Sequence, residues 1–240
     1  MPTATLTLWN DADCRRLHEA TLQLLAEVGV EVLQDEASLR LYAELGADVQ
    51  GTRVRFAPEL IERALAAAPR EWVVKPRGGE TEPIVLRDGD VYWGTGSDCL
   101  YVRDPDTHER RRAVLADIEG MAALVEKLRH MDFAMTMASP DDVDPAVDDV
   151  VHVAALLKGT RKPLLLTPIN GRRLARIQEM AAVAGEKDSI VVYAMPSPPL
   201  QHDADALSKV VNCAELQIPL IYAPAPCAGT TAPRSVTGPG

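Results

Sequence analysis

The sequence predicts an α/β protein that is the first half of a (β/α)8 TIM-type barrel, preceded by a small α+β amino-terminal region. After about residue 113, amphipathic helical segments alternate with short apolar strands, which start roughly 27 to 31 residues apart. This spacing suits βα units with right-handed crossovers, whose parallel strands are buried on both faces. Ser, Thr, Asn and Pro collect directly after the strands, at the edge where a barrel keeps its active site. We therefore expect two regions, residues 1–112 and 113–240.

The amino-terminal region is expected to start with three helices. Asp11 or Asp13 can cap the first helix, and Gly29 can end it in a left-handed conformation. The second helix should occupy about 35–46, and the third should begin near Pro58, a residue suited to a first helical turn.

Between residues 72 and 114 the hydrophobic pattern changes from that of helices to that of extended strands. The extended runs WVVKP, IVL, VYW, LYV and RRAV are separated by RDGD, GTGSDC and RDPDTHE, which have the composition of turns. This region should be a small antiparallel meander.

The glycine-rich stretch 94-GTGSDC-99 lies inside this meander and resembles a phosphate-binding loop only superficially. Cys99 stands where GxGxxG has its third glycine, and no GK[ST] follows. Because the stretch joins strand to strand, it presents no helix amino terminus to an anion. A wide hairpin or bulge is predicted. The functional alternative is a loop that lets the backbone approach a ligand closely at the barrel mouth.

Four βα units should follow. Their helices are expected to start near 117, 144, 172 and 203, and their strands to occupy 132–137, 163–167, 190–194 and 219–223. A doubly wound open sheet is the alternative, but no segment after these strands is the glycine-rich turn that a nucleotide-binding sheet uses. A complete barrel needs eight units, so the sequence looks like the amino-terminal half of one.

Composition excludes several classes of protein. Lys and Arg number 25 against 35 Asp and Glu, and the net charge of −10 argues against binding nucleic acid. The four cysteines form no CxxC pair and the histidines no HExxH pair, so no tightly bound metal is predicted. Reduced thiols indicate a cytoplasmic location. No apolar run reaches the roughly 18 residues of a membrane-spanning helix, and no signal peptide is recognisable.

Several segments, in this order, resemble the trimethylamine methyltransferase family. They include LHEATLQLLAEVGVEV (17–32), VYWGTGSDCLYVRDPDTHERRRAVLADIEGMAALVEKL (91–128), SPDDVDP (139–145), GTRKPLLLT (159–167), SPPLQHDADAL (197–207) and AELQIPLIYAPAPCAGTTAP (214–233). The resemblance implies a barrel roughly twice this length. It also implies methyl transfer from a tertiary or quaternary amine, such as trimethylamine or glycine betaine, to the Co(I) of a corrinoid held by a small partner protein. Arg234 stands where relatives have a small or apolar residue.

The expected site must hold a methylated ammonium cation in line with cobalt, and it is predicted from aromatic, acidic and hydroxyl side chains. Aromatic faces attract cations, and a carboxylate such as Asp98 can add to this attraction. Hydroxyl groups just past the strands, including Thr167, are where a barrel presents polar groups. The predicted substrate-binding residues are Trp93, Gly94, Gly96, Ser97, Asp98, Tyr101, Ser139, Tyr193, Ser197, Tyr222 and Thr230. No catalytic residue is assigned.

Two other functions compete with this one. The chain could be a non-catalytic half-barrel binding or assembly module derived from such an enzyme. An unrelated hydrolase or lyase would need Asp98 and a histidine to converge from separate segments. If the chain is a half barrel, whether as the methyltransferase or as the non-catalytic module, its exposed strand edges and apolar face predict self-association.

Overall fold

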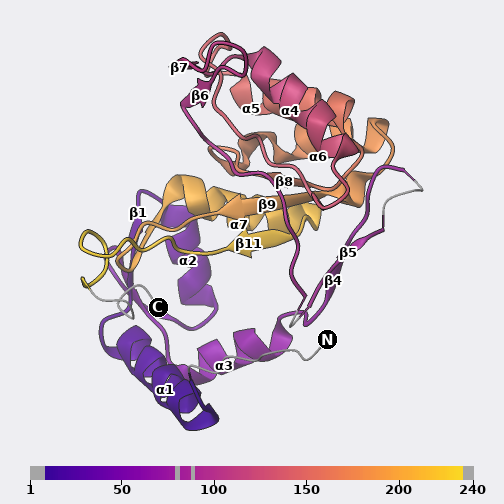
Figure 1. The fold of residues 1–240 in the computed structure, drawn as a ribbon. Coiled ribbons are helices and arrows are strands. Elements are labelled where there is room, and N and C mark those ends of the chain that lie inside the picture. Colours follow the sequence, from indigo (N-terminus) through magenta and orange to yellow (C-terminus); the bar gives the residue numbers. More distant parts are fainter. Residues whose placement is uncertain (1–8, 79–81, 88–89, 235–240) are drawn as a thin grey trace. The chain divides into compact units, whose positions relative to one another are not determined.

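The computed structural model describes residues 9–78, 82–87 and 90–234, which divide into two compact units. The first unit contains residues 9–68, 197–204 and 226–234, and the second contains the remaining described residues. Both mix helices with strands, so the fold is α/β as predicted (Figure 1). None of the described helices is both long and apolar enough to cross a bilayer.

The first unit is built on one four-stranded sheet with the order β10-β1-β3-β2. Its elements are α1 (Asp11–Glu27), β1 (Val30–Leu33), α2 (Glu36–Glu44), β2 (Asp48–Gln50), β3 (Arg53–Arg55), α3 (Pro58–Ala67) and β10 (Gln201–Asp203). β1 is antiparallel to β3 and parallel to β10. The strand β10 belongs to a segment about 170 residues further along the chain, and no sequence pattern predicted this pairing.

The three predicted helices of the first unit are confirmed. Gly29 follows α1 with φ +69°, and α3 starts at Pro58. The cap of α1 is Asn10 and neither predicted aspartate: its Oδ1 accepts hydrogen bonds from the backbone of Ala12 and Asp13. The Asp13 carboxylate accepts one in return from the Asn10 amide, which completes a capping box.

The second unit is organised around parallel strands. β8 (Leu164–Leu166), β9 (Ile190–Ala194) and β11 (Leu220–Tyr222) form a sheet in which β8 and β11 flank β9. Isolated parallel bridges extend it, because Ala134 pairs with Leu164 and Gly94 with Phe133. The strands therefore neighbour one another in chain order, and among the described residues they do not close into a barrel.

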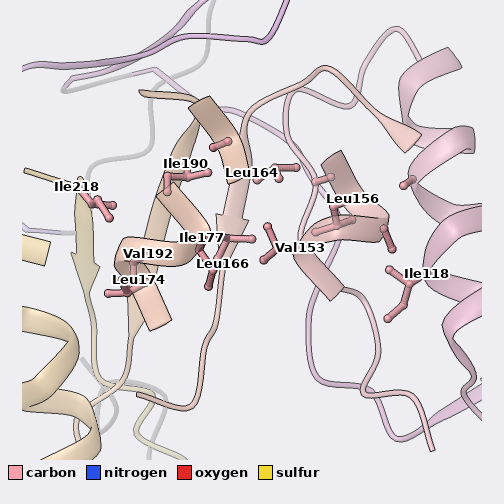
Figure 2. Close-up of a cluster of buried hydrophobic side chains, with 14 of the residues drawn as sticks. Ile118, Val153, Leu156, Leu164, Leu166, Leu174, Ile177, Ile190, Val192 and Ile218 are labelled. Carbon is pink, nitrogen blue, oxygen red and sulfur yellow. The ribbon is translucent and has the colours of Figure 1, made fainter. Parts of the chain in front are cut away.

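Helices cover one face of this sheet. They are α4 (Leu115–Lys127), α5 (Asp148–Gly159), α6 (Leu174–Val183) and α7 (Ala204–Leu216), with 3-10 turns at Gly171–Arg173 and Lys187–Ser189. Figure 2 shows side chains of α4, α5 and α6 gathered with those of β8 and β9, including Ile118, Leu156, Leu166, Ile177 and Val192. All five are at most 1% exposed, so this cluster is the main core.

The opposite face of the sheet packs against a strand pair. β4 (Trp72–Val74) and β5 (Ile84–Leu86) are antiparallel, and Val74 and Ile84 cluster with Val191 of β9. Since Val191 lies between Ile190 and Val192 of the main core, β9 is buried on both faces, as its continuous apolar sequence predicts.

The predicted meander is wrong. Residues 72–112 instead form two separate antiparallel pairs, β4 with β5 and β6 (Tyr101–Arg103) with β7 (Arg110–Arg112). The run 91–93 is not a strand, and Asp88 and Gly89 of the predicted RDGD turn lie outside the described residues. The glycine-rich stretch is neither a hairpin nor a bulge, because it pairs in parallel with residues 133–138 at the edge of the second unit's sheet.

Two boundaries of the predicted βα units also differ. Residues 132–137 form only isolated bridges, at Phe133 and Ala134, and the run ends at Met137, which adopts φ +51°. α5 begins at Asp148 and not near Asp144, because Asp144 instead accepts a hydrogen bond from the Ala146 amide in a preceding turn.

Candidate functional site

A cavity of about 120 Å³ lies where the parallel strands of the second unit end. We call it the Asp98 cavity. Segments that follow strands or bridges supply its polar groups Asp98, Thr136, Ser139 and Thr167, and the first turns of α5 supply Asp148, Asp149 and His152. Its volume exceeds the roughly 30 Å³ that one water molecule occupies in the liquid, so it has room for a small organic ligand.

The glycine-rich stretch places Asp98 at this cavity. The Met137 amide donates to the Gly96 carbonyl at 2.9 Å, and the Cys99 amide donates to the Met137 carbonyl at 3.0 Å. Between Gly94 and Gly96, the Thr95 hydroxyl replaces the backbone in this ladder and accepts from the Met135 amide at 2.8 Å. The stretch is thus fixed along residues 132–139 and carries Asp98 at its end.

Asp98 has an unusual backbone conformation and a fixed carboxylate. Its φ is +62°, a left-handed conformation that is strained for most residues and tolerated by Asp and Asn. The Ser97 hydroxyl donates to Oδ2 at 2.6 Å and the Thr167 hydroxyl donates to Oδ1 at 3.1 Å. Asp98 is therefore held by Ser97 of its own segment and by Thr167, which follows β8 on the far side of residues 132–139 in the sheet.

The first turn of α5 adds two more carboxylates. Asp149 is buried and accepts a hydrogen bond from Arg173 at 2.7 Å, so its charge is balanced. Asp148 accepts one from the Asp149 amide at 2.6 Å. Within the described part of the chain, neither Asp98 nor Asp148 forms an ion pair with a Lys or Arg. The cavity therefore has an excess of negative charge.

His152 follows one turn later on the same helix and is 6% exposed. Its Nε2 is buried and has no hydrogen-bond partner among the described residues. Burial lowers the pKa of His152, although the nearby carboxylates of Asp148, Asp149 and Asp98 oppose this shift. The imidazole is consequently neutral near pH 7.

The cavity is suited to a small cation. Two carboxylates that have no basic partner among the described residues supply the negative charge. Hydroxyl groups surround one of them, and apolar atoms of Val153, Leu166 and Ile177 line the wall. Asp98 and His152 line the same cavity but are not hydrogen-bonded to each other. No group of three or more His, Cys, Asp or Glu side chains in the described ranges is arranged to hold a metal ion.

The predicted aromatic residues do not line this cavity. Trp93 is 68% exposed, and the Tyr101 ring is covered by the Arg110 guanidinium, which lies 3.7 Å from the ring centroid. Tyr193 is in register with Ile221 and Tyr222 with Ala194, so the two tyrosines point to opposite faces of the sheet.

The remaining predicted residues divide between the two units. Ser139 lines the Asp98 cavity, and Ser97 does not line it but hydrogen-bonds Asp98, whereas Ser197 and Thr230 belong to the first unit. There the Ser197 hydroxyl donates to Asp203 at 3.2 Å and that of Thr230 to the Cys227 carbonyl at 3.1 Å.

Sequence reasoning missed the contribution of α5. Asp148 and His152 are four residues apart and therefore share one face of a helix, a spacing that could have identified them.

Comparison with known proteins agrees with the family resemblance seen in the sequence. The model of the family "Trimethylamine methyltransferase (MTTB)" matches residues 2–239. The glycine betaine methyltransferase of Desulfitobacterium hafniense (strain Y51) is 28% identical over 233 residues, which cover 93% of this chain and 48% of that protein. Trimethylamine methyltransferase MttB of D. hafniense (strain DSM 10664 / DCB-2) is 27% identical, with 96% and 48% covered. The proline betaine:corrinoid methyltransferase of Eubacterium limosum is 25% identical, with 94% and 49% covered. The chain spans about half the length of these relatives.

Proposed function

Because the chain belongs to the trimethylamine methyltransferase (MTTB) family, we propose that the protein moves a methyl group from a methylated amine to the cobalt of a corrinoid held by a small partner protein. The names of three relatives support the reaction, since each is a methyltransferase for trimethylamine or a betaine. One of these names also specifies a corrinoid. We also propose that the protein is cytoplasmic.

The chemistry requires a site that binds positive charge. The bond between nitrogen and the methyl carbon breaks, its electron pair stays on nitrogen, and the amine leaves neutral. Co(I) of the corrinoid supplies the electron pair for the new bond to carbon. The protein's own residues must therefore bind the ammonium and orient its methyl group, and they need no strong acid or base.

The Asp98 cavity is the single observation that carries this proposal. It combines the charges of Asp98 and Asp148, which form no ion pair with a described Lys or Arg, with an apolar wall and a volume suited to a small methylated amine. Of the substrate-binding residues predicted from sequence, Asp98 and Ser139 are supported because they line it, and Ser97 is supported because it holds the Asp98 carboxylate. The contributions of Trp93, Gly94, Gly96, Tyr101, Tyr193, Ser197, Tyr222 and Thr230 stay proposals.

We also infer that the second unit is part of a (β/α)8 barrel. The order of its strands supports this inference, because they neighbour one another in chain order from residue 94 to β11. A doubly wound sheet reverses this order near its middle. We also propose a boundary near residue 112, between an amino-terminal region and the βα units. A further part of this proposal is that the protein self-associates through the β11 edge.

Substitution of Asp98 tests the function. The form of the protein that its gene encodes is incubated with cob(I)alamin and trimethylamine or glycine betaine, and the cobalt spectrum is followed. Asp98→Asn preserves size and tolerance of positive φ while removing the charge. A carboxylate about 4 Å from a cation contributes about 1 kcal/mol in water and about 4 kcal/mol near a protein surface. As Asp98 is exposed, we expect a loss near the lower limit, about 5- to 30-fold in kcat/KM.

Asp106→Asn is the matched control, because Asp106 is an exposed aspartate in the turn between β6 and β7. It should keep full activity. An unchanged cobalt spectrum with every methylated amine would refute methyl transfer, and amine binding without transfer would favour the non-catalytic module.

Acid–base catalysis by a hydrolase or lyase is the second candidate function, since Asp98 and His152 line one cavity. The two side chains are not hydrogen-bonded, so no acid–base pair is formed in this structure. Release of amine in the absence of any corrinoid would favour this candidate over methyl transfer.

A further inference from the structure

The hairpin of β6 and β7 carries arginine side chains on one face. Tyr101 is in register with Arg112, and Arg103 with Arg110. Residues opposite each other in an antiparallel pair, and residues two apart in one strand, lie on the same face of the sheet. Three arginines and one tyrosine therefore share this face, and all four residues are exposed. We call it the arginine face.

The other face of the hairpin is fixed against the second unit. Both terminal nitrogens of Arg111 donate hydrogen bonds to the carboxylate of Asp117 in α4, each at 2.8 Å. The Nε of Arg111 donates to Asp104, at the start of the hairpin turn, at 3.0 Å. Because these bonds tie the hairpin to α4 and hold its turn, the arginine face is a preformed surface.

The arginine face holds more positive charge than its surroundings neutralise. Arg103 and Arg110 lie directly opposite each other, an arrangement of like charges that destabilises a strand pair. The guanidinium carbons of Arg110 and Arg112 lie 3.7 and 5.2 Å from the centroid of the Tyr101 ring, so two like charges share one ring. Among the described residues, only Arg112 of these arginines has a carboxylate partner, Asp141 at 2.9 Å. An acidic partner would relieve this repulsion.

The arginine face borders the Asp98 cavity. β6 begins three residues after Asp98, and the Ser139 amide donates to the Cys99 carbonyl at 3.0 Å between them. On the other strand, Arg112 pairs with Asp141, two residues after Ser139. Asp98 and Ser139 both line the cavity. Both strands of the hairpin are thus tied to the rim of the cavity, and a protein docked on the arginine face lies beside it.

We propose that the arginine face docks an acidic surface of the small protein that carries the corrinoid, which brings the cobalt to the Asp98 cavity. This inference rests on the proposed function and adds the surface on which its partner binds. Arg and Tyr are enriched in protein interfaces, and the planar guanidinium matches the geometry of a carboxylate. Since the hairpin is already fixed by Arg111, docking has to order only the ends of exposed side chains.

A nucleic acid is the other kind of partner that arginine and tyrosine suit, because bases stack on both side chains. The strands of the hairpin have three residues each and span only about 10 Å, so the arginine face can contact few phosphates. Asp106 and Glu109 in the turn and the net charge of −10 would repel the rest of a long polyanion. These charges favour an acidic protein surface.

The first test measures the binding of fluorescein-labelled decaglutamate, by fluorescence anisotropy, to the form of the protein that its gene encodes. The double variant Arg103→Gln with Arg110→Gln removes the two arginines without a carboxylate partner among the described residues. An exposed ion pair contributes up to about fivefold in affinity, so we expect the Kd to rise about tenfold. Arg63→Gln with Arg176→Gln is the control, because it removes the same charge from exposed positions of α3 and α6, and it should change the Kd by less than about twofold.

The second test follows methyl transfer to cobalamin presented in two ways. When a small acidic corrinoid-binding protein holds the cobalamin, the double variant should raise the apparent KM for that protein about tenfold and leave kcat unchanged. With free cob(I)alamin, the double variant and the unsubstituted protein should react at equal rates, because neither arginine lines the cavity. A general loss of folded protein would lower both rates.

Three outcomes would overturn the inference. An equal effect of the double variant and the control on decaglutamate binding would remove the arginine face as a docking surface. Tighter, arginine-dependent binding of a ten-nucleotide single strand of DNA would assign the face to nucleic acid. An unchanged KM for the corrinoid-binding protein would show that this partner docks elsewhere.

The proposed function fails by a different result. If the unsubstituted protein transfers no methyl group to either form of cobalamin, methyl transfer and a corrinoid-carrying partner are both refuted. Arginine-dependent binding of decaglutamate would then still support the arginine face as a docking surface for an acidic protein.

Discussion

Replacement of Gly94 by alanine should destabilise the protein through a single steric contact. A Cβ atom at residue 94 would lie 2.3 Å from Cε2 of Phe133, and two further ring atoms would lie within 2.5 Å. Ordinary contacts of this kind start near 3.4 Å, so the ring must move by about 1.1 Å (3.4 − 2.3). Phe133 packs against the cluster of Val74, Ile84 and Val191, which resists that movement.

The expected magnitude follows from two opposing effects. Overpacking of a filled region costs about 1–3 kcal/mol. A Gly to Ala change also stabilises by about 0.4–1 kcal/mol, because it restricts the unfolded chain. Gly96 has nothing within 4 Å of its Cβ position and no positive φ, so Gly96→Ala has only the second effect. The free energies of unfolding of the two variants should therefore differ by about 1–3 kcal/mol.

Urea denaturation followed by circular dichroism measures this difference. The double variant Gly94→Ala with Phe133→Leu should recover most of the loss caused by Gly94→Ala, because the obstructing ring is gone, and a double-mutant cycle then gives the coupling. If Gly94→Ala is as stable as Gly96→Ala, or if Phe133→Leu brings no relief, the close approach of these two segments is wrong.

Two further predictions concern other parts of the second unit. Gly159→Ala should lower the free energy of unfolding by about 1–3 kcal/mol, because its Cβ would lie 2.5 Å from that of Ala122 where α4 and α5 meet. Stability should fall as the pH decreases from about 4 to 2, since hydrogen bonds from the Thr107 amide and the Arg111 side chain lower the pKa of Asp104 to about 2. The folded pKa is the lower one, so the unfolded chain binds the proton first and acid favours unfolding. In Asp104→Asn, the midpoint temperature of thermal unfolding should change less between pH 4 and pH 2 than it does in the unsubstituted protein.

Each of these predictions has its own check. Gly120→Ala is the control for Gly159→Ala, because the Cβ position of Gly120 in α4 has nothing within 4 Å, and this change should stabilise the helix. Equal stabilities of the two variants would contradict the predicted clash. An acid transition of the same steepness in Asp104→Asn and the unsubstituted protein would show that Asp104 does not contribute to it.

Local signals allowed much of the fold to be predicted from sequence. Gly29 and Pro58 mark helix ends because their backbone preferences act within a few residues. The continuous apolar run of β9 predicted a strand buried on both faces, and it is one. These features need no information about the rest of the chain.

Pairings between distant segments could not be predicted in the same way. Gly94 pairs with Phe133 and β10 with β1, and nothing in either local pattern specifies the partner. Extended segments separated by turn residues suggest hairpins, so the glycine-rich stretch was expected to join its immediate neighbours. Its real partner lies about 40 residues away, and α4 stands between the two segments in the sequence.

The site shows the same division between local and distant information. Thr167 was expected just past a buried strand and lies there, because polar residues that follow such strands collect at one edge of a parallel sheet. Asp98 was expected in a turn between two antiparallel strands, and it instead follows a segment that pairs in parallel with residues 133–138. The orientation of Tyr193 and Tyr222 depends on their register, which a sequence pattern does not fix.

This arrangement explains the role of the glycine-rich stretch. Gly94 lets the stretch lie against Phe133, and the Thr95 hydroxyl maintains its ladder with residues 132–139. The stretch then ends in the left-handed residue Asp98, whose carboxylate accepts a hydrogen bond from the hydroxyl of Thr167 at the end of β8. Strained residues persist only where the surrounding structure fixes them, and they concentrate at functional sites. A stretch that resembles a phosphate loop therefore positions a carboxylate, and Gly94 is the glycine whose close packing allows it. A carboxylate attracts the opposite charge.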